Sequence, residues 1–139
     1  MTTQYKKPLP VITTEAQEFW DGCKNEELLI QKCSDCGTLR WTPRPMCHEC
    51  TSMKSGWAKV SGKGTVYSYT IVYHPVHPGF VEEVPYTVVL VDLEEGGVRF
   101  LSNLVDCPIE GVKVGMPVEV VFEPVTPEVT LPKFRPAKG

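Results

Sequence analysis

Four of the six cysteines of the chain lie close together in the segment KCSDCGTLRWTPRPMCHEC. They form two Cys-x-x-Cys pairs, Cys33 with Cys36 and Cys47 with Cys50, and ten residues separate the pairs. Four thiolates in this arrangement match a tetrahedral zinc site, in which each pair bends its backbone so that both sulfurs face one ion. Gly37 follows the first pair directly, where a metal-binding turn often needs a positive φ. The segment therefore predicts a zinc ribbon, and a set of merely buried or disulfide-bonded cysteines is the alternative.

The four cysteines also predict a structural rather than a catalytic metal. Catalytic zinc keeps an open position for water and typically has three protein ligands, whereas four thiolates close the site. We expect His48 to point away from the ion. Iron is the alternative metal, because four sulfurs also suit an electron carrier similar to rubredoxin. Thr51 and Ser52 stand after the second pair in place of glycine, which favours zinc.

Length and composition indicate a globular protein with one core. The chain of 139 residues contains 42% hydrophobic and 22% charged residues, as soluble folded domains do. No apolar run approaches the roughly 20 residues of a membrane helix, and the N-terminal segment lacks the apolar stretch of a secretory signal. We therefore expect a cytoplasmic protein. In that reducing compartment, paired cysteines indicate metal or redox use rather than disulfides.

The N-terminal region predicts an extended arm over residues 1–12 and then one short helix. Thr14 and Gln17 have the spacing of a capping box, which would open a helix through residues 15–25. The apolar residues of this segment recur at spacings of three and four and form one stripe: Ala16, Phe19, Trp20 and Cys23. We expect this stripe to pack on the core of the protein or on a partner.

The remainder of the chain has the pattern of β-structure. Two ribbon strands are expected at residues 27–33 and 38–44. Valine, tyrosine, threonine and isoleucine then mark five barrel strands, the last of them an edge strand because it contains Pro132: 56–74, 85–93, 97–105, 117–125 and 128–134. Gly62 and Gly64 would bend the first of these, and residues 94–97 form a tight hairpin turn.

This pattern predicts a mainly β protein with three parts. They are an N-terminal arm and helix over residues 1–26, a four-cysteine zinc ribbon over 27–55, and a five-stranded OB-type barrel over 56–139. The long loop at residues 74–84 fits the binding loop between the first two strands of an OB barrel. We expect no helix between the third and fourth barrel strands, because that segment is rich in proline and glycine.

Six residues outside the cysteine cluster are candidates for ligand or partner contact. Arginine suits phosphate binding, and an aromatic residue on a mobile loop tip suits docking. The candidates are Arg40, Trp41 and Arg44 near the ribbon, and His74, His77 and Phe80 in the long loop. No carboxylate or nucleophile accompanies the histidines in a recognisable catalytic pattern. Cys23 and Cys107 are interpreted as small hydrophobic residues.

Binding of single-stranded nucleic acid is an alternative function, because OB barrels bind it with stacked aromatic residues and a basic groove. Tyr67, Tyr69 and Tyr73 alternate on the first barrel strand and could form that stacking face or pack in the core. The charge argues against this function: the net charge is −3, and the segment after Ser55 holds 10 of the 17 acidic residues but 7 of the 14 basic ones. Phosphate-binding surfaces usually show the opposite bias.

The order of the elements resembles that of the DUF35 family, OB-fold acyl-CoA-associated proteins with a rubredoxin-like zinc ribbon. The resemblance rests on a helix, a ribbon with CxxCG and PRxxCxxC, and the segments GKGTVYSYT, VPYTVVLVDLEEG and VGMPVEVVF. It runs from about Thr14 to Phe134. The four paired cysteines match the metal ligands of the family. The other matching residues are Gly37, Pro43, Arg44, Gly62, Gly64, Pro85 and Tyr86.

The resemblance implies an accessory subunit that binds acyl-CoA and pairs with a thiolase-fold enzyme. Such partners include acetyl-CoA acetyltransferases, hydroxymethylglutaryl-CoA synthase and aldolases of steroid side-chain breakdown, and some relatives are fused to or paired with hydratases of the MaoC type. The resemblance carries no catalytic residue over to this chain. We therefore expect a non-catalytic component of a hetero-oligomer, with structural zinc and an acyl-CoA ligand.

Overall fold

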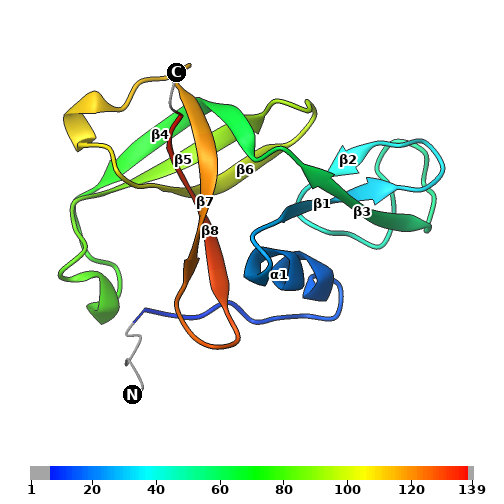
Figure 1. Cartoon of the computed structure of the whole chain (residues 1–139), viewed down its shortest axis with the longest axis horizontal. Coiled ribbons are helices and arrows are strands. Elements are labelled where there is room, and N and C mark those ends of the chain that lie inside the picture. The colour runs from blue at the N-terminus through cyan, green and yellow to red at the C-terminus, as the bar shows by residue number, and fades with distance from the viewer. Residues whose placement is uncertain (1–6, 138–139) are drawn as a thin grey trace.

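The structure is a computed structural model that describes residues 7–137; the first part of the predicted arm lies outside this range. Helix α1 (Gln17–Lys24) precedes all the strands (Figure 1). The strands are β1 (Leu28–Cys33), β2 (Leu39–Arg40), β3 (Ser55–Val60), β4 (Lys63–Val72), β5 (Tyr86–Leu93), β6 (Arg99–Leu104), β7 (Pro117–Pro124) and β8 (Thr130–Pro136). Two 3-10 turns, η1 (Pro78–Phe80) and η2 (Ile109–Gly111), lie in the loops.

The strands form a small sheet and a barrel. The sheet has the order β2-β1-β3, and the closed barrel has the order β4-β5-β6-β8-β7. In Figure 1 the barrel and the ribbon sheet lie side by side, and α1 lies at the junction between them. The predicted fold class is therefore confirmed: an N-terminal helix, a four-cysteine ribbon and a five-stranded OB-type barrel. None of the helices within residues 7–137 has the length and hydrophobicity that a membrane-spanning helix needs.

The long strand predicted at residues 56–74 is in fact two strands. β3 pairs with β1 along its whole length, from Ser55↔Cys33 to Val60↔Leu28, and so belongs to the ribbon sheet. The chain then turns at Gly62, which has φ +81° and a carbonyl that accepts from the backbone N–H of Val120 at 2.8 Å. A Cβ at this glycine would collide with the Val120 side chain. The predicted bend is therefore the crossing from the ribbon to the barrel.

The prediction that the last strand lies at a sheet edge is wrong, because β8 closes the barrel between β6 and β7. β8 pairs with β7 over seven residues, but within residues 7–137 its one strand pairing with β6 is Leu104↔Phe134. Pro132 faces this nearly unpaired side, since backbone groups alternate between the two sides of a strand. Its missing N–H therefore interrupts no ladder hydrogen bond.

The predicted capping box does not form. Helix α1 begins at Gln17 with Ala16 as its N-cap residue, and no side chain of the described residues caps it. The Ala16 N–H instead donates to both oxygens of Thr13, the backbone carbonyl at 3.1 Å and Oγ1 at 3.3 Å. The predicted apolar stripe is confirmed: Phe19 and Cys23 are 1% and 0% exposed. The helix therefore owes its place to packing rather than to capping, as expected of a segment this short.

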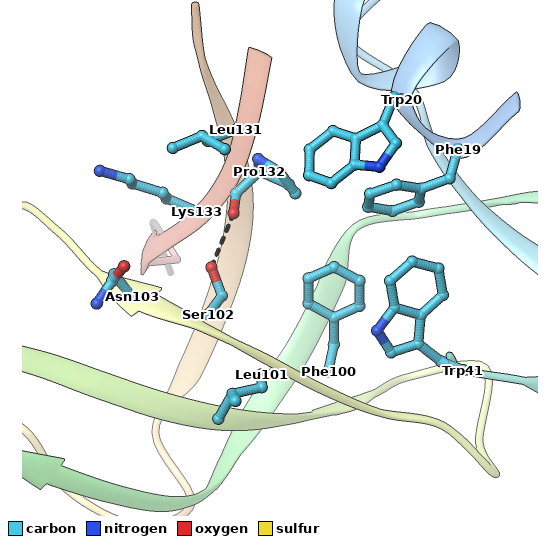
Figure 2. Close-up of a pocket in the computed structure, with 10 residues that line it drawn as sticks. All are labelled: Phe19, Trp20, Trp41, Phe100, Leu101, Ser102, Asn103, Leu131, Pro132 and Lys133. Atoms are coloured by element: carbon cyan, nitrogen blue, oxygen red, sulfur yellow. Dashed lines mark hydrogen bonds between the residues drawn. The ribbon is translucent and has the colours of Figure 1, made fainter. Parts of the chain in front are cut away.

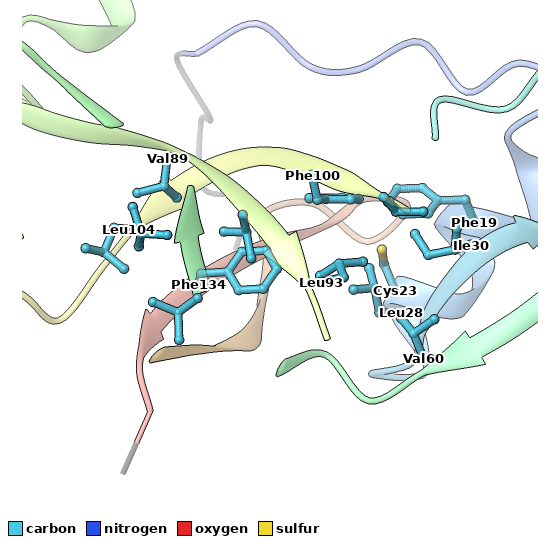
Figure 3. Packing of buried hydrophobic residues seen from close by; sticks show 14 of the residues in the cluster. Phe19, Cys23, Leu28, Ile30, Val60, Val89, Leu93, Phe100, Leu104 and Phe134 are labelled. Atoms are coloured by element: carbon cyan, nitrogen blue, oxygen red, sulfur yellow. The ribbon is translucent and has the colours of Figure 1, made fainter. Parts of the chain in front are cut away.

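A single hydrophobic core joins the helix, the ribbon and the barrel. Phe19 and Cys23 of α1 belong to the same buried cluster as Leu28, Ile30 and Val60 of the ribbon sheet and Leu93, Phe100 and Phe134 of the barrel. Figure 3 shows Phe100 and Leu93 between the barrel residues and the group from α1 and the ribbon.

The segment between β6 and β7 contains only the three-residue 3-10 turn η2, so the predicted absence of an α-helix there is confirmed.

Candidate metal centre and ligand groove

The four paired cysteines converge on one point. Their Sγ atoms all lie within 4.8 Å of one another, with Cys33 and Cys50 3.5 Å apart and Cys36 and Cys47 3.6 Å apart. Zinc–sulfur bonds of about 2.3 Å in a tetrahedron place the sulfurs roughly 3.8 Å apart, whereas a disulfide would need about 2.05 Å. All of these cysteines are free. The cluster therefore fits a four-thiolate zinc ion and excludes the disulfide alternative.

Two matching turns hold the sulfurs. In each turn, the residue after the second cysteine donates to the carbonyl of the first cysteine: Gly37 to Cys33 at 3.1 Å and Thr51 to Cys47 at 3.0 Å. Both residues have positive φ, 78° for Gly37 and 63° for Thr51. The prediction from Gly37 is confirmed. The second turn has the same backbone conformation without glycine, although a β-branched residue with positive φ is strained. The backbone of the two cysteine pairs is therefore alike despite the lack of glycine after the second pair.

The surroundings of the thiols favour a bound cation. The backbone N–H of Cys36, 3.5 Å from Cys33 Sγ, is the main cause that lowers the pKa of Cys33 to about 6. The backbone N–H of Ser52 acts to lower the pKa of Cys50, but the adjacent Cys33 thiol and burial outweigh it and raise that pKa to about 12. Crowded thiols suppress one another's ionisation, and a divalent cation removes this repulsion. His48 is exposed, with Nε2 3.6 Å from Glu49, outside the cluster.

The loop between the two cysteine pairs is fixed from inside the ribbon. Arg40 is 3% exposed, and its Nη2 donates to the carbonyl of Arg44 at 3.0 Å. The backbone N–H of Arg44 donates in turn to Oε1 of Gln31 at 2.7 Å. Nε and Nη1 of Arg40 have no hydrogen-bond partner among the described residues. The structure thus places Arg40 in the interior and leaves Arg44, also a candidate for phosphate contact, exposed.

Trp41 links the ribbon to the barrel. Its ring stacks on Phe100 of β6, with centroids 5.0 Å apart and an interplanar angle of 26°. Phe19 of α1 lies 4.4 Å from the Trp41 ring and 4.9 Å from the Trp20 ring. Three parts of the fold therefore meet in one aromatic cluster, defined here as Phe19, Trp20, Trp41 and Phe100.

The aromatic cluster forms one end of a groove between β6 and β8 (Figure 2). The groove has a volume of about 250 Å³. It is lined by the aromatic cluster together with Leu101, Ser102, Asn103, Leu131, Pro132 and Lys133. A second hollow of about 330 Å³ shares Phe19, Trp20 and Trp41 and continues past Thr13 and Pro43. Sequence reasoning found Trp41 but missed the β6 and β8 residues, because nothing in the sequence shows that these two strands separate here.

The long loop lies elsewhere. In Figure 1, η1 stands on the far side of the barrel from the ribbon, so the structure does not bring His74, His77 and Phe80 together with the ribbon candidates. Phe80 was expected on a mobile loop tip, but its ring stacks on the ring of Tyr86 with centroids 5.3 Å apart. Nδ1 of His77 accepts from the backbone N–H of Gly79 at 2.9 Å, and His74 is exposed.

The two single cysteines and the tyrosines also have defined surroundings. Cys23 is fully buried, and burial raises the pKa of its thiol to about 12, which confirms the prediction of a small hydrophobic residue. Cys107 is half-buried. Tyr67, Tyr69 and Tyr73 are 47%, 39% and 67% exposed, so all three lie at the surface rather than in the core.

A four-thiolate ribbon that shares its core with a five-stranded barrel defines the class: a zinc ribbon fused to an OB fold. Residues 20–52 match the family model "ChsH2, rubredoxin-like zinc ribbon domain", and residues 57–123 match "ChsH2, C-terminal OB-fold domain". A DUF35 domain-containing scaffold protein of Methanocaldococcus jannaschii is 38% identical over 74% of this chain and 73% of its own length. The chain belongs to the DUF35 family.

Two further comparisons give relatives whose names describe enzymes or their subunits. A probable enoyl-CoA hydratase alpha subunit of Thermomonospora curvata is 41% identical over 94% of this chain, but the chain spans only 40% of that protein. A solved structure described as the Ltp2-ChsH2(DUF35) aldolase superposes with a TM-score of 0.85 at 41% identity. The match covers 94% of this chain and 100% of that one.

Proposed function

We propose that the protein is a non-catalytic accessory subunit that binds an acyl-CoA and partners a thiolase-fold enzyme. The reaction of the complex would be acyl transfer, or aldol or retro-aldol cleavage of a CoA thioester. The observation that carries this proposal is the aromatic groove at the junction of ribbon, helix and barrel in a chain of this family. Its lining is mostly apolar, with Ser102, Asn103 and Lys133 as the polar side chains, which suits binding of an acyl thioester better than proton transfer.

The metal has a structural role in this proposal. The four sulfurs surround one point, which leaves zinc no open position for water or substrate. The ribbon holds Trp41 against Phe100, so a bound zinc would keep one wall of the groove in place. The zinc itself would supply no chemistry to the thioester.

The names of the relatives support a subunit role. The Thermomonospora curvata relative is named as an alpha subunit of an enzyme acting on an enoyl-CoA, and the solved aldolase structure names two components. The exposed parts of α1, the ribbon and the loop at residues 74–84 offer docking surface for such a partner. Trp41, Arg44, His74, His77 and Phe80 stay candidates for ligand or partner contact, with Arg40 acting from the interior through the position of Arg44.

The test is reconstitution with the thiolase-fold protein encoded nearest to this chain. We expect the two proteins to co-elute from a sizing column, and calorimetry to detect acyl-CoA binding to this chain or to the complex. Trp41→Ala should weaken acyl-CoA binding while leaving zinc content unchanged, and Tyr73→Ala, on the exposed surface, serves as the matched control. A chain that neither co-elutes with such an enzyme nor binds an acyl-CoA would contradict the proposal.

One observation favours a second function, single-stranded nucleic acid binding. The three tyrosines named above are exposed, and the guanidinium of Arg99 lies 3.7 Å from the ring centroid of Tyr67. Stacking on such rings is a common way to hold unpaired bases. Titration of a labelled oligonucleotide tests it: binding that weakens steeply with salt and is lost in Tyr67→Ala would support this function over the first.

A further inference from the structure

The barrel is closed by one residue pair at the seam between β6 and β8. Leu104↔Phe134 is the only pairing between these strands in the described part of the chain, and Val105 N donates to Phe134 O there at 2.7 Å. Toward the ribbon, the Ser102 hydroxyl bridges the two strands by donating to the carbonyl of Pro132 at 2.8 Å. Figure 2 shows this bridge beside the aromatic cluster. The groove is therefore the open part of the seam.

Two hydrogen bonds fix which backbone groups of β6 face the open seam. At one end the Val98 carbonyl accepts from Leu93 N at 3.1 Å, on the β5 side, and at the other Val105 N donates toward β8. Backbone groups of successive residues in an antiparallel strand alternate between its two sides. Even-numbered residues of β6 therefore bond to β5, and the N–H and C=O of Leu101 and Arg99 face the seam.

These groups form a short, unpaired strand edge. Leu104↔Phe134 is the one strand pairing of β6 with β8 within residues 7–137, so the backbone edge from Arg99 to Leu101 has no strand partner. Leu101 is 64% exposed. At about 3.3 Å per residue, this edge is roughly 10 Å long. An unpaired edge beside an apolar groove is a ready template for another extended chain that carries amide groups.

We propose that this edge binds the two-amide arm of an acyl-CoA as a short added strand, with the acyl group against the aromatic cluster. The inference rests on the proposed function and names the part of the ligand that the groove holds. The arm between the thioester and the nucleotide of coenzyme A contains two amides, which matches an edge of three residues. A partner peptide adding a strand of ordinary length, about five or six residues, would find too few free groups.

The aromatic cluster sets the direction of the arm. Trp41 and Phe100 lie at the ribbon end of the seam, and Ser102 bridges to β8 at the other end. Apolar surface is buried best where the rings are, so the acyl group lies at the ribbon end. The two amides of the arm then lie along the edge from Arg99 to Leu101. Because main-chain groups bind the arm, the site recognises the thioester arm common to all acyl-CoAs.

The experiment compares three probes by NMR of the zinc-loaded chain: octanoyl-CoA, S-octanoyl-pantetheine, which keeps both amides without the nucleotide, and octanoate, which has neither. We expect the first two to shift the Leu101 amide signal and the indole signals of Trp20 and Trp41. Octanoate should shift the indole signals alone. The indole of Trp57, outside the groove, is the internal control.

Two variants test the edge itself. Leu101→Pro removes the N–H that faces the seam without breaking a bond to β5, and we expect octanoyl-pantetheine to bind roughly five- to tenfold more weakly, the value of one hydrogen bond. Leu101→Ala keeps the N–H and should bind within about threefold of the unmodified chain. If the proline variant does not fold, the Leu101 amide shift in the unmodified chain decides the question.

The outcomes separate this inference from the proposed function. Binding of octanoyl-CoA with shifts confined to other parts of the chain would overturn the inference and leave the proposed function in place. No binding of any acyl-CoA, alone or with the partner enzyme, would overturn both. Protection of the Leu101 amide by the partner enzyme, with octanoyl-CoA having no effect there, would assign the edge to the partner and also overturn the inference.

Discussion

The ring of Trp41 stacks on the ring of Phe100 at a centroid distance of 5.0 Å, and this contact joins the zinc ribbon to the barrel. Trp41 comes from the loop between the two cysteine pairs, and Phe100 comes from β6, far along the chain. Phe19 of α1 touches both rings, at 4.4 Å and 6.0 Å. The metal ribbon and the groove are therefore parts of one packed unit, and a change at this contact should lower the stability of the whole unit.

Trp41→Ala should lower the free energy of unfolding by about 2–3 kcal/mol, because it removes a large half-buried ring and its aromatic contacts. Trp41→Phe keeps a ring against Phe100 and should cost less than about 1.5 kcal/mol. Urea unfolding followed by circular dichroism measures both. Equal losses for the two variants would mean that the stacking does not stabilise the junction.

Cys36→Ser should release the metal and expose the ribbon to proteolysis, since a structural zinc site contributes folding free energy through its ligands. Zinc content by mass spectrometry and the position of protease cleavage report the effect, which we expect within residues 33–54. Cys107→Ser is the matched control, because Cys107 lies outside the sulfur cluster and its change should leave zinc content intact. A Cys36→Ser protein with full zinc content would contradict a four-thiolate site.

Zinc binding should release protons at pH 7, and the affinity should fall as the pH falls. The reason is that the pKa of Cys50 without metal is raised to about 12, so this thiol holds its proton at neutral pH and must lose it to become a ligand. Calorimetric titration of zinc into the metal-free protein, in two buffers of different ionisation enthalpy, measures the proton release. A binding enthalpy independent of the buffer would contradict the prediction.

Gly62→Ala should destabilise the protein by about 2–4 kcal/mol. It places a side chain at φ +81° and drives a Cβ into Val120, so backbone strain and overpacking add. Gly96 has a similar φ of +86° with open space around it, and Gly96→Ala should cost only about 1 kcal/mol. Thermal unfolding of the two variants separates the collision from the strain, and similar losses in both would rule out the collision as the main cause.

Local patterns in the sequence predicted much of this protein. The spacing of Cys33, Cys36, Cys47 and Cys50 predicted the metal centre, because two-residue gaps force the sulfurs of each pair to one side of a turn. Alternating β-branched and aromatic residues predicted the five barrel strands, and the apolar stripe of α1 predicted its buried face. Each of these patterns depends on neighbours a few residues apart.

The tertiary structure decided where those elements meet. The sequence could not show that β3 belongs to the ribbon, because the strand pattern continues through the glycines that separate it from β4. It could not show that β8 closes the barrel through one pair with β6, because Pro132 is tolerated both at a sheet edge and at an open seam. The groove depends on that seam and on contacts between Phe19, Trp41 and Phe100. Packing between residues so far apart in the chain leaves no local periodicity, and so only the folded structure reveals it.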